Sequence, residues 1–204
     1  KICGITDPEQ AQAIAQMGVQ AIGVIGVHAT PRFVEPAQRR ALFQMLEEQH
    51  PLLHRVWVVA NPDDAALEEA LNGAGQPSVV QLHGGESVEC CQRLKQRYPR
   101  QQLWKALRVR EPDDLKQLEH YAPHVDALLI DAWSADQLGG TGHRIPLDWV
   151  RETELSVPWW LAGGVSAEWV PELLSRVNPQ GLDASSRLEE RPGWKNLDLS
   201  LIHI

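Results

Sequence analysis

The sequence is poor in cysteine, in basic charge and in long apolar runs. Its 204 residues include three cysteines, two of them adjacent, which excludes a disulfide framework and favours a reducing compartment. Lys and Arg number 19 against 27 Asp and Glu, and the net charge of −8 disfavours nucleic acid and anionic membranes as partners. Runs such as Ala21–Val27 are too short to cross a membrane, and the first residues lack a secretory signal. We therefore expect a soluble cytoplasmic protein.

Short, nearly continuous apolar segments recur along the chain, which is typical of parallel strands covered on both faces. Between them, residues at helical spacing such as Ala11, Ile14 and Ala15 indicate helices. Thr6-Asp-Pro-Glu9 predicts a helix start, with Thr6 as N-cap and Glu9 completing a capping box. Strands are expected at Lys1–Cys3, Ala21–Val27, Arg55–Val59, Ser78–Leu82, Gln102–Ala106, Ala127–Ile130, Trp159–Ala162 and Gly181–Ala184.

This alternation predicts an α/β fold, a single (β/α)8 TIM barrel of the phosphate-binding type that forms one catalytic domain over residues 1–204. Strand starts lie on average about 27 residues apart, close to the minimum for a strand and its crossover helix. The main alternative is an open doubly wound sheet. That sheet is disfavoured because no G-x-G-x-x-G follows the first strand and the glycine-rich turns come late, where barrels bind phosphate.

Two late motifs predict an anion site. Gly163-Gly164 ends the seventh strand. Gly163-Gly164-Val-Ser166 leads directly into the helix predicted by the apolar stripe that begins at Trp169, and the first N–H groups of a helix attract anions. Ser185-Ser186 follows the eighth strand and can add hydroxyl and amide donors. The simpler interpretation is that these glycines only make tight turns, but the pairing on consecutive strand ends favours a phosphate site.

Cys3 and Asp131 end the first and sixth strands, where barrel enzymes place reactive residues. These strands are three apart around a ring of eight, so the two side chains can face each other across the mouth. One can then take a proton while the other gives one. The alternatives are a small buried apolar cysteine and a carboxylate that caps a loop.

Three further side chains are candidates for binding. Arg32, in a loop stiffened by Pro31, can hold a carboxylate with two hydrogen bonds, although most arginines are solvated. Gln81 and His83 alternate along the fourth strand and point the same way, and His83 is equally compatible with a core histidine. Cys90-Cys91 is expected to pack on a helix. No metal-ligand motif occurs, and no metal is expected.

The sequence resembles the phosphoribosylanthranilate isomerase family of tryptophan biosynthesis over essentially its whole length. The resemblance rests on Lys-Ile-Cys3-Gly-Ile-Thr6, Thr30-Pro-Arg32, Val80-Gln-Leu-His83-Gly84, Leu129-Ile-Asp131, Gly139-Gly-Thr-Gly142, Leu161-Ala-Gly-Gly164 and Asp183-Ala-Ser-Ser186.

The resemblance implies an Amadori rearrangement of N-(5-phosphoribosyl)anthranilate. It implies that Asp131 is the general acid, Cys3 the general base and Arg32 the anchor of the anthranilate carboxylate. It further implies a phosphate site at Gly163-Gly164 and Ser185-Ser186, a small phosphorylated substrate as the partner, and no cofactor. The substrate-binding set predicted in full is Arg32, Gln81, His83, Gly140, Gly163, Gly164, Ser185 and Ser186. Members of the family occur as monomers and homodimers.

Arg187 departs from the family pattern, because it stands where glycine is usual. If that glycine serves a positive φ, the arginine would strain the loop; if not, its charge can help to bind the phosphate.

Two alternative functions remain. The first is that of the related histidine-pathway ketol-isomerase, which typically has Asp where this chain has Cys3. The presence of both Cys3 and Asp131 disfavours a barrel that only binds a phosphorylated ligand.

Overall fold

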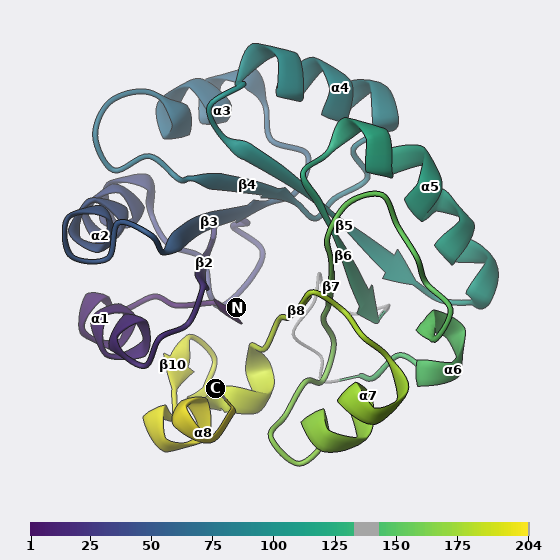
Figure 1. Cartoon of the computed structure of the whole chain (residues 1–204). Coiled ribbons are helices and arrows are strands. Elements are labelled where there is room, and N and C mark those ends of the chain that lie inside the picture. The colour runs from purple at the N-terminus through teal and green to yellow at the C-terminus, as the bar shows by residue number, and fades with distance from the viewer. Residues whose placement is uncertain (133–142, 204) are drawn as a thin grey trace.

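The structure is a computed structural model that describes residues 1–132 and 143–203. Eight parallel strands pair in sequence order (Figure 1). They are β1 (Ile2–Cys3), β2 (Ala21–Ile25), β3 (His54–Val59), β4 (Val79–Leu82), β5 (Gln102–Val109), β6 (Ala127–Ala132), β7 (Trp159–Leu161) and β8 (Gly181–Leu182). The ring closes because Cys3 N–H donates to Ala184 O at 2.9 Å, and Ala184 N–H donates to Lys1 O at 3.1 Å. The chain is a (β/α)8 barrel.

The helices lie outside the strands (Figure 1). They are α1 (Pro8–Gln16), α2 (Pro36–Gln49), α3 (Asp64–Leu71), α4 (Val88–Arg97), α5 (Gln117–Tyr121), α6 (Leu147–Val150), α7 (Val170–Arg176) and α8 (Leu197–His203), with 3-10 turns η1 (Pro112–Lys116), η2 (Ala122–His124) and η3 (Ser186–Leu188). The last helix, α8, contacts the first, α1. Across the described part of the chain, no helix has the length and apolar character to span a membrane.

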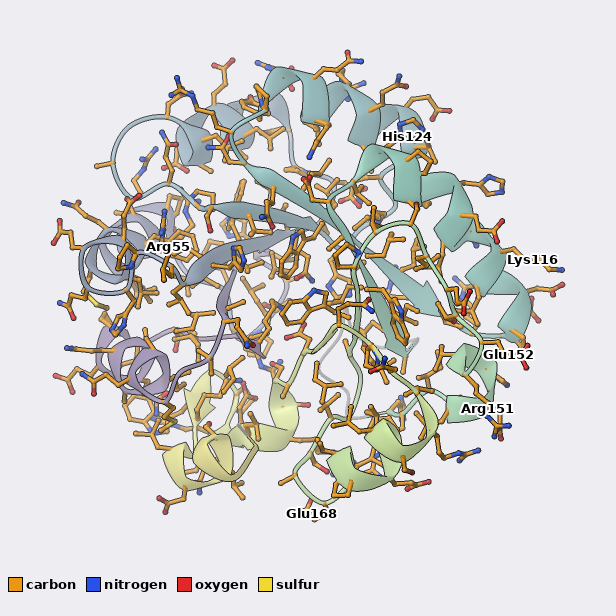
Figure 2. All side chains as sticks on the ribbon, viewed as in Figure 1. Arg55, Lys116, His124, Arg151, Glu152 and Glu168 are labelled. Carbon is orange, nitrogen blue, oxygen red and sulfur yellow. The ribbon has the colours of Figure 1, made fainter. Side chains whose placement is uncertain are left out.

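The apolar side chains form two layers. One layer, which includes Leu42 and Phe43, joins the outer face of the strands to the helices. The other fills the inside of the barrel, where the rings of Trp104 and Trp160 lie 5.0 Å apart. A Cβ at Gly181 would lie 2.3 Å from the Trp160 ring, so glycine in β8 makes room for this filling. Charged side chains such as those of Lys116 and Glu168 point outward from the rim (Figure 2).

All eight predicted strands are confirmed, and Cys90-Cys91 lies on α4 as expected. One local prediction is wrong. The N-cap of α1 is Asp7, whose carboxylate accepts from Gln10 N–H, while Thr6 Oγ1 instead donates to Gly193 O at 2.7 Å. Helix α7 begins at Val170, inside the apolar stripe predicted from Trp169, and Pro171 fits its first turn because an N–H there would have no helical acceptor.

A hairpin that was not predicted from the sequence follows the barrel strands. It consists of β9 (Glu189–Arg191) and β10 (Trp194–Lys195), which pair antiparallel. Two hydrogen bonds tie this hairpin to α1: Gln10 Nε2 donates to Lys195 O at 2.8 Å, and Lys195 N–H donates to Gln10 Oε1 at 2.9 Å. The hairpin therefore joins the end of the chain to its beginning, beside the mouth of the barrel.

Candidate active site

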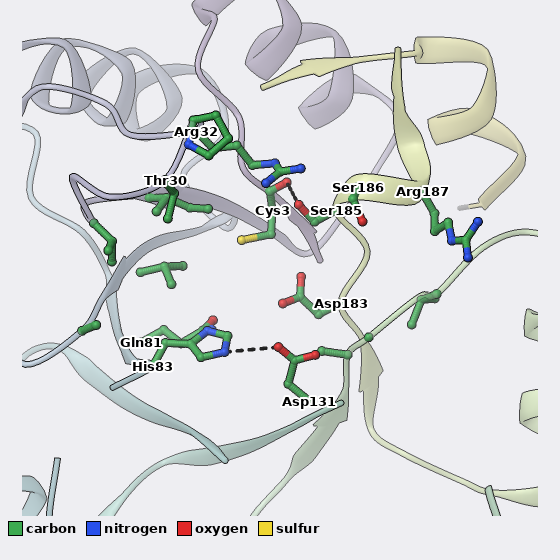
Figure 3. Close-up of a pocket in the computed structure, with 18 of the residues that line it drawn as sticks. Cys3, Thr30, Arg32, Gln81, His83, Asp131, Asp183, Ser185, Ser186 and Arg187 are labelled. Carbon is green, nitrogen blue, oxygen red and sulfur yellow. Dashed lines mark hydrogen bonds and ion pairs between the residues drawn. The ribbon is translucent and has the colours of Figure 1, made fainter. Parts of the chain in front are cut away.

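A cavity of about 320 Å³ opens at the carboxyl ends of the barrel strands. Its lining includes nearly all residues that the sequence singled out: Cys3, Arg32, Gln81, His83, Asp131, Gly163, Gly164, Ser185 and Ser186 (Figure 3). Gly140 lies outside the described residues. Residues from the first and last strands thus meet in one pocket, as the barrel rule predicts.

Cys3 sits at the end of β1 and is 7% exposed. Gly23 on the neighbouring strand β2 leaves room for the sulfur, since a Cβ there would lie 2.7 Å from Cys3 Sγ. Burial raises the pKa of the Cys3 thiol above its usual range, and the positive charge of Lys1 opposes that rise. The thiolate that a base requires is therefore disfavoured by burial and favoured by Lys1.

Lys1 and Asp183 form a buried ion pair beside this thiol. Lys1 Nζ donates to Asp183 Oδ2 at 2.6 Å. Burial lowers the pKa of Lys1, but the charges of Asp183 and Cys3 outweigh it and hold the pKa above its usual value. The other carboxylate oxygen, Asp183 Oδ1, is buried and has no hydrogen-bond partner within the described residues. Figure 3 shows the Asp183 carboxylate between Cys3 and Asp131, so this oxygen can accept a hydrogen bond from a hydroxyl of a bound ligand.

Asp131 ends β6 and lies opposite His83 (Figure 3). His83 Nε2 is 3.2 Å from Asp131 Oδ2, close enough for an ion pair but not aligned as a hydrogen bond. On the other side of the ring, Gln81 Nε2 and His83 Nδ1 are 3.3 Å apart. If the amide donates there, a neutral ring carries its proton on Nε2, the nitrogen that lies nearer to Asp131.

The loop that carries His83 is held by hydrogen bonds and an ion pair of Glu86 and Lys105. Glu86 Oε2 accepts from Gly84 N–H at 3.0 Å and from Lys105 Nζ at 2.9 Å. Glu86 Oε1 accepts from Asn61 N–H at 2.6 Å, and Asn61 has a positive φ of 48°. A buried carboxylate with this many donors holds the loop in one conformation.

Arg32 reaches the pocket from the loop after β2, but one edge of its guanidinium is already engaged. Its Nε donates to Glu189 Oε1 at 2.9 Å, and its Nη2 donates to Glu189 Oε2 at 2.6 Å. Hydrogen bonding to Glu189 raises the pKa of Arg32 above its usual value. Burial favours the neutral form of Glu189, but Arg32 and Lys195 outweigh it and hold its pKa below the usual range.

The predicted phosphate-binding residues come together at one side of the cavity. Gly163 and Gly164 have φ of 86° and 63°, values that favour glycine. Within the described residues, the N–H groups of Gly163, Gly164 and Ser186 donate to no protein acceptor. Arg187 also lines the cavity. Its φ is not positive, so an arginine at this position does not strain the loop.

Four residues of the site were not predicted from the sequence: Lys1, Glu86, Glu189 and Lys195. Lys1 shares the inward face of β1 with Cys3, and this period-two spacing was a usable signal. No such signal exists for Glu86, Glu189 and Lys195. Most charged residues are exposed, so from the sequence alone each of these three is expected on the surface.

The chain matches the family model described as N-(5'phosphoribosyl)anthranilate (PRA) isomerase over residues 1–202. It belongs to this family. An N-(5'-phosphoribosyl)anthranilate isomerase of Synechococcus elongatus is 46% identical over 198 residues, which cover 97% of this chain and 90% of that protein. The isomerase of Thermosynechococcus vestitus is 43% identical over 199 residues, covering 97% and 84%.

Solved structures of isomerases from this family have the same fold. The phosphoribosyl anthranilate isomerase of Thermotoga maritima superposes with a TM-score of 0.85 at 26% identity, covering 99% of this chain and 94% of that one. Another solved isomerase is in complex with reduced 1-(o-carboxyphenylamino)-1-deoxyribulose 5-phosphate. It has a TM-score of 0.80 at 27% identity, with coverage of 99% and 94%.

Proposed function

We propose that this chain isomerises N-(5'-phosphoribosyl)anthranilate to 1-(2-carboxyphenylamino)-1-deoxyribulose 5-phosphate in tryptophan biosynthesis, with Cys3 as general base and Asp131 as general acid. The observation that carries the assignment is the placement of both side chains in one cavity, from β1 and β6, in a member of the isomerase family. The complex of a related isomerase with a reduced form of the product supports the substrate class.

In this mechanism, Asp131 gives its proton to the furanose ring oxygen. The C1–O bond breaks while the nitrogen lone pair forms the C1=N bond of a Schiff base. The Cys3 thiolate then removes the C2 proton, and the C–H electrons form the C1=C2 enolamine as the nitrogen regains its lone pair. Tautomerisation of the enolamine gives the ketone. The substrate's own nitrogen is the electron sink, so these steps call on no cofactor.

The remaining pocket residues have binding roles in this proposal. Arg32 holds the anthranilate carboxylate, and Gln81 and His83 line the side of the pocket next to Asp131. The turns at Gly163-Gly164 and Ser185-Ser186 hold the phosphate. The N–H groups of Gly163, Gly164 and Ser186, which donate to no acceptor in the described part of the chain, support this last role, since a phosphate oxygen is a strong acceptor.

The test is an assay that follows loss of phosphoribosylanthranilate fluorescence with the purified protein. We expect Cys3→Ala and Asp131→Asn each to lower kcat by about 100- to 10,000-fold, because a positioned acid or base typically contributes that much. Cys91→Ala is the matched control, since Cys91 is also buried but lies on α4 and does not line the cavity. Near-normal turnover by a folded Cys3→Ala protein would remove Cys3 as the base.

We further propose that the chain is a cytoplasmic protein and a monomer or homodimer. A structure described as mutually generated monomers of the dimeric isomerase from Thermotoga maritima, with a TM-score of 0.80, supports both states for this fold. Light scattering on the purified protein distinguishes them.

A further inference from the structure

The cavity is bordered by a buried cluster of three charged side chains, only one of which has a place in the proposed mechanism. Arg32 lines the cavity, while Glu189 and Lys195 belong to the β9–β10 hairpin outside the barrel sheet. The side chains of Arg32, Glu189 and Lys195 are 8%, 4% and 0% exposed. Burying a charged group costs desolvation free energy, so a buried carboxylate beside Arg32 calls for an explanation of its role.

Glu189 occupies one particular edge of the guanidinium. Both of its oxygens accept from Arg32 Nε, at 2.9 and 3.1 Å, and Oε2 also accepts from Nη2 at 2.6 Å. A guanidinium is planar and has a second edge, formed by Nη1 and Nη2. Within the described residues, Arg32 Nη1 donates to no protein group. With the Nε edge bound, the second edge is left to hold a carboxylate with two parallel hydrogen bonds.

Glu189 cannot readily follow Arg32 if the arginine moves, because the carboxylate is itself held. Lys195 Nζ donates to Glu189 Oε1 at 2.7 Å, and Gly193 N–H donates to the same oxygen at 3.3 Å. Lys195 Nζ also donates to Ser185 O at 3.1 Å, which connects the cluster to the loop after β8. The stem of Arg32 is confined as well, since a Cβ at Gly4 would lie 2.7 Å from Arg32 Cδ.

We propose that Glu189 is a positioning residue that fixes the orientation of Arg32, and that it thereby sets the preference of this site for substrates that carry an aromatic carboxylate. This inference rests on the proposed function, in which Arg32 holds the anthranilate carboxylate. The opposite hypothesis is that Glu189 competes with the substrate for Arg32. The two differ in sign, because removal of a competitor strengthens carboxylate binding and removal of a positioning group weakens it.

The experiment compares ligands with and without the carboxylate. The first readout is calorimetric binding of reduced 1-(o-carboxyphenylamino)-1-deoxyribulose 5-phosphate and of the same compound with phenylamino in place of carboxyphenylamino. The second is kcat and KM for phosphoribosylanthranilate and for phosphoribosylaniline. Binding does not depend on turnover, so it tests the role of Glu189 even if the proposed reaction fails. Absence of turnover by the unmodified protein would refute the proposed function by itself.

For Glu189→Gln we expect the carboxylated ligand to bind about tenfold more weakly or worse. The substitution removes the charge-assisted hydrogen bonds that hold Arg32 in place, so Arg32 binds the ligand carboxylate less well. The KM for phosphoribosylanthranilate should rise by a similar factor with kcat little changed, and the ligand without the carboxylate should bind as before. The preference for the carboxylate should approach that of Arg32→Ala. Glu189→Asp keeps the charge but withdraws it by one methylene, and should give a smaller effect of the same sign if Glu189→Gln does not fold.

The control is Glu69→Gln, which breaks an ion pair of Glu69 with Arg39 that is not part of the cavity lining. It should leave the preference unchanged. Three outcomes would overturn the proposal. Both Glu189 variants could bind both ligands as the unmodified protein does, they could bind both ligands equally more weakly, or they could bind the carboxylated ligand more tightly. Equal weakening would mean that Glu189 only supports the fold, and tighter binding would mean that it competes.

Discussion

At the scale of single residues, the least expected property of the site is the state of its proposed base. Cys3 is buried, and burial raises the pKa of its thiol, so most of the protein near neutral pH carries the protonated form. A base must be deprotonated to act. Lys1 partly offsets the burial because its ammonium favours the thiolate.

A dependence on pH follows. We expect the thiolate fraction of Cys3, measured as the ultraviolet thiolate absorbance that a Cys3→Ala variant lacks, to increase from about pH 6 to pH 9, since the pH approaches a thiol pKa that is raised above its ordinary value. Lys1→Met should move this rise to still higher pH, because it removes the cation and leaves Asp183 unpaired nearby. A thiolate titration that is complete below about pH 7 would mean that Lys1 outweighs burial and that the pKa of the Cys3 thiol is lowered.

The sequence was informative about residues whose position follows from a strand end. Cys3, Gln81 and Asp131 could be placed in the pocket because the carboxyl ends of barrel strands converge. The state of Arg32 could not be predicted in the same way. It depends on Glu189, which lies 157 residues away in the sequence, and no local pattern encodes such a pairing.

At the scale of elements, the strands were predictable and the connections were less so. A parallel strand buried on both faces leaves a nearly continuous apolar segment, and most of the barrel strands did. The β9–β10 hairpin did not, because its strands are two or three residues long and mostly polar. Between Gly164 and α7 the chain turns at Ser166, whose carbonyl oxygen accepts from the N–H groups of Trp169 and Val170.

The turn after β7 provides a test at this scale. Gly163 has a φ of 86°, and an added Cβ would lie 2.9 Å from both Ala132 Cβ and His143 O. Gly163→Ala should therefore displace the turn, raise the KM of the phosphorylated substrate and weaken binding of inorganic phosphate. Gly18→Ala is the matched control, with a φ of 89° but nothing within 4 Å of the added Cβ.

Both variants should lose roughly 1–2 kcal/mol of unfolding free energy, because alanine is strained in a left-handed conformation. Only Gly163→Ala should change KM and phosphate binding. If Gly18→Ala changed them equally, the effect would come from general loss of stability, and the assignment of the turn as a phosphate site would lose its support.

At the scale of the whole molecule, the closure of the barrel and the site depend on the same contacts. The chain just after β8 meets β1 through the hydrogen bonds of Ala184 with Lys1 and Cys3, and the hairpin beyond it reaches back to Thr6 and Gln10. Glu189 lies at the centre of this junction, where it binds Arg32 and Lys195. The residue proposed to orient the substrate anchor is thus also one that connects the two ends of the chain.

This double role predicts how stability depends on pH. Arg32 and Lys195 hold the pKa of Glu189 below its usual value despite burial, so folding favours the charged carboxylate. The resulting stabilisation is fully present above the ordinary glutamate pKa of about 4.3 and is lost as the pH falls through the lower folded value. The Glu189→Gln variant lacks this charge-dependent stabilisation at every pH. The difference in unfolding free energy between the unmodified protein and Glu189→Gln should therefore be large at pH 7 and become smaller on acidification.

Urea unfolding followed by tryptophan fluorescence, at pH 7 and at several values below the ordinary glutamate pKa, measures this difference. Glu69→Gln is again the control, because its carboxylate has a lowered pKa but a side chain that is 37% exposed, where solvent screens the ion pair. Its difference from the unmodified protein should be small at every pH. Parallel loss of stability in the unmodified protein and Glu189→Gln would mean that the Glu189 charge does not stabilise the junction, and that neutral contacts hold the hairpin against the barrel.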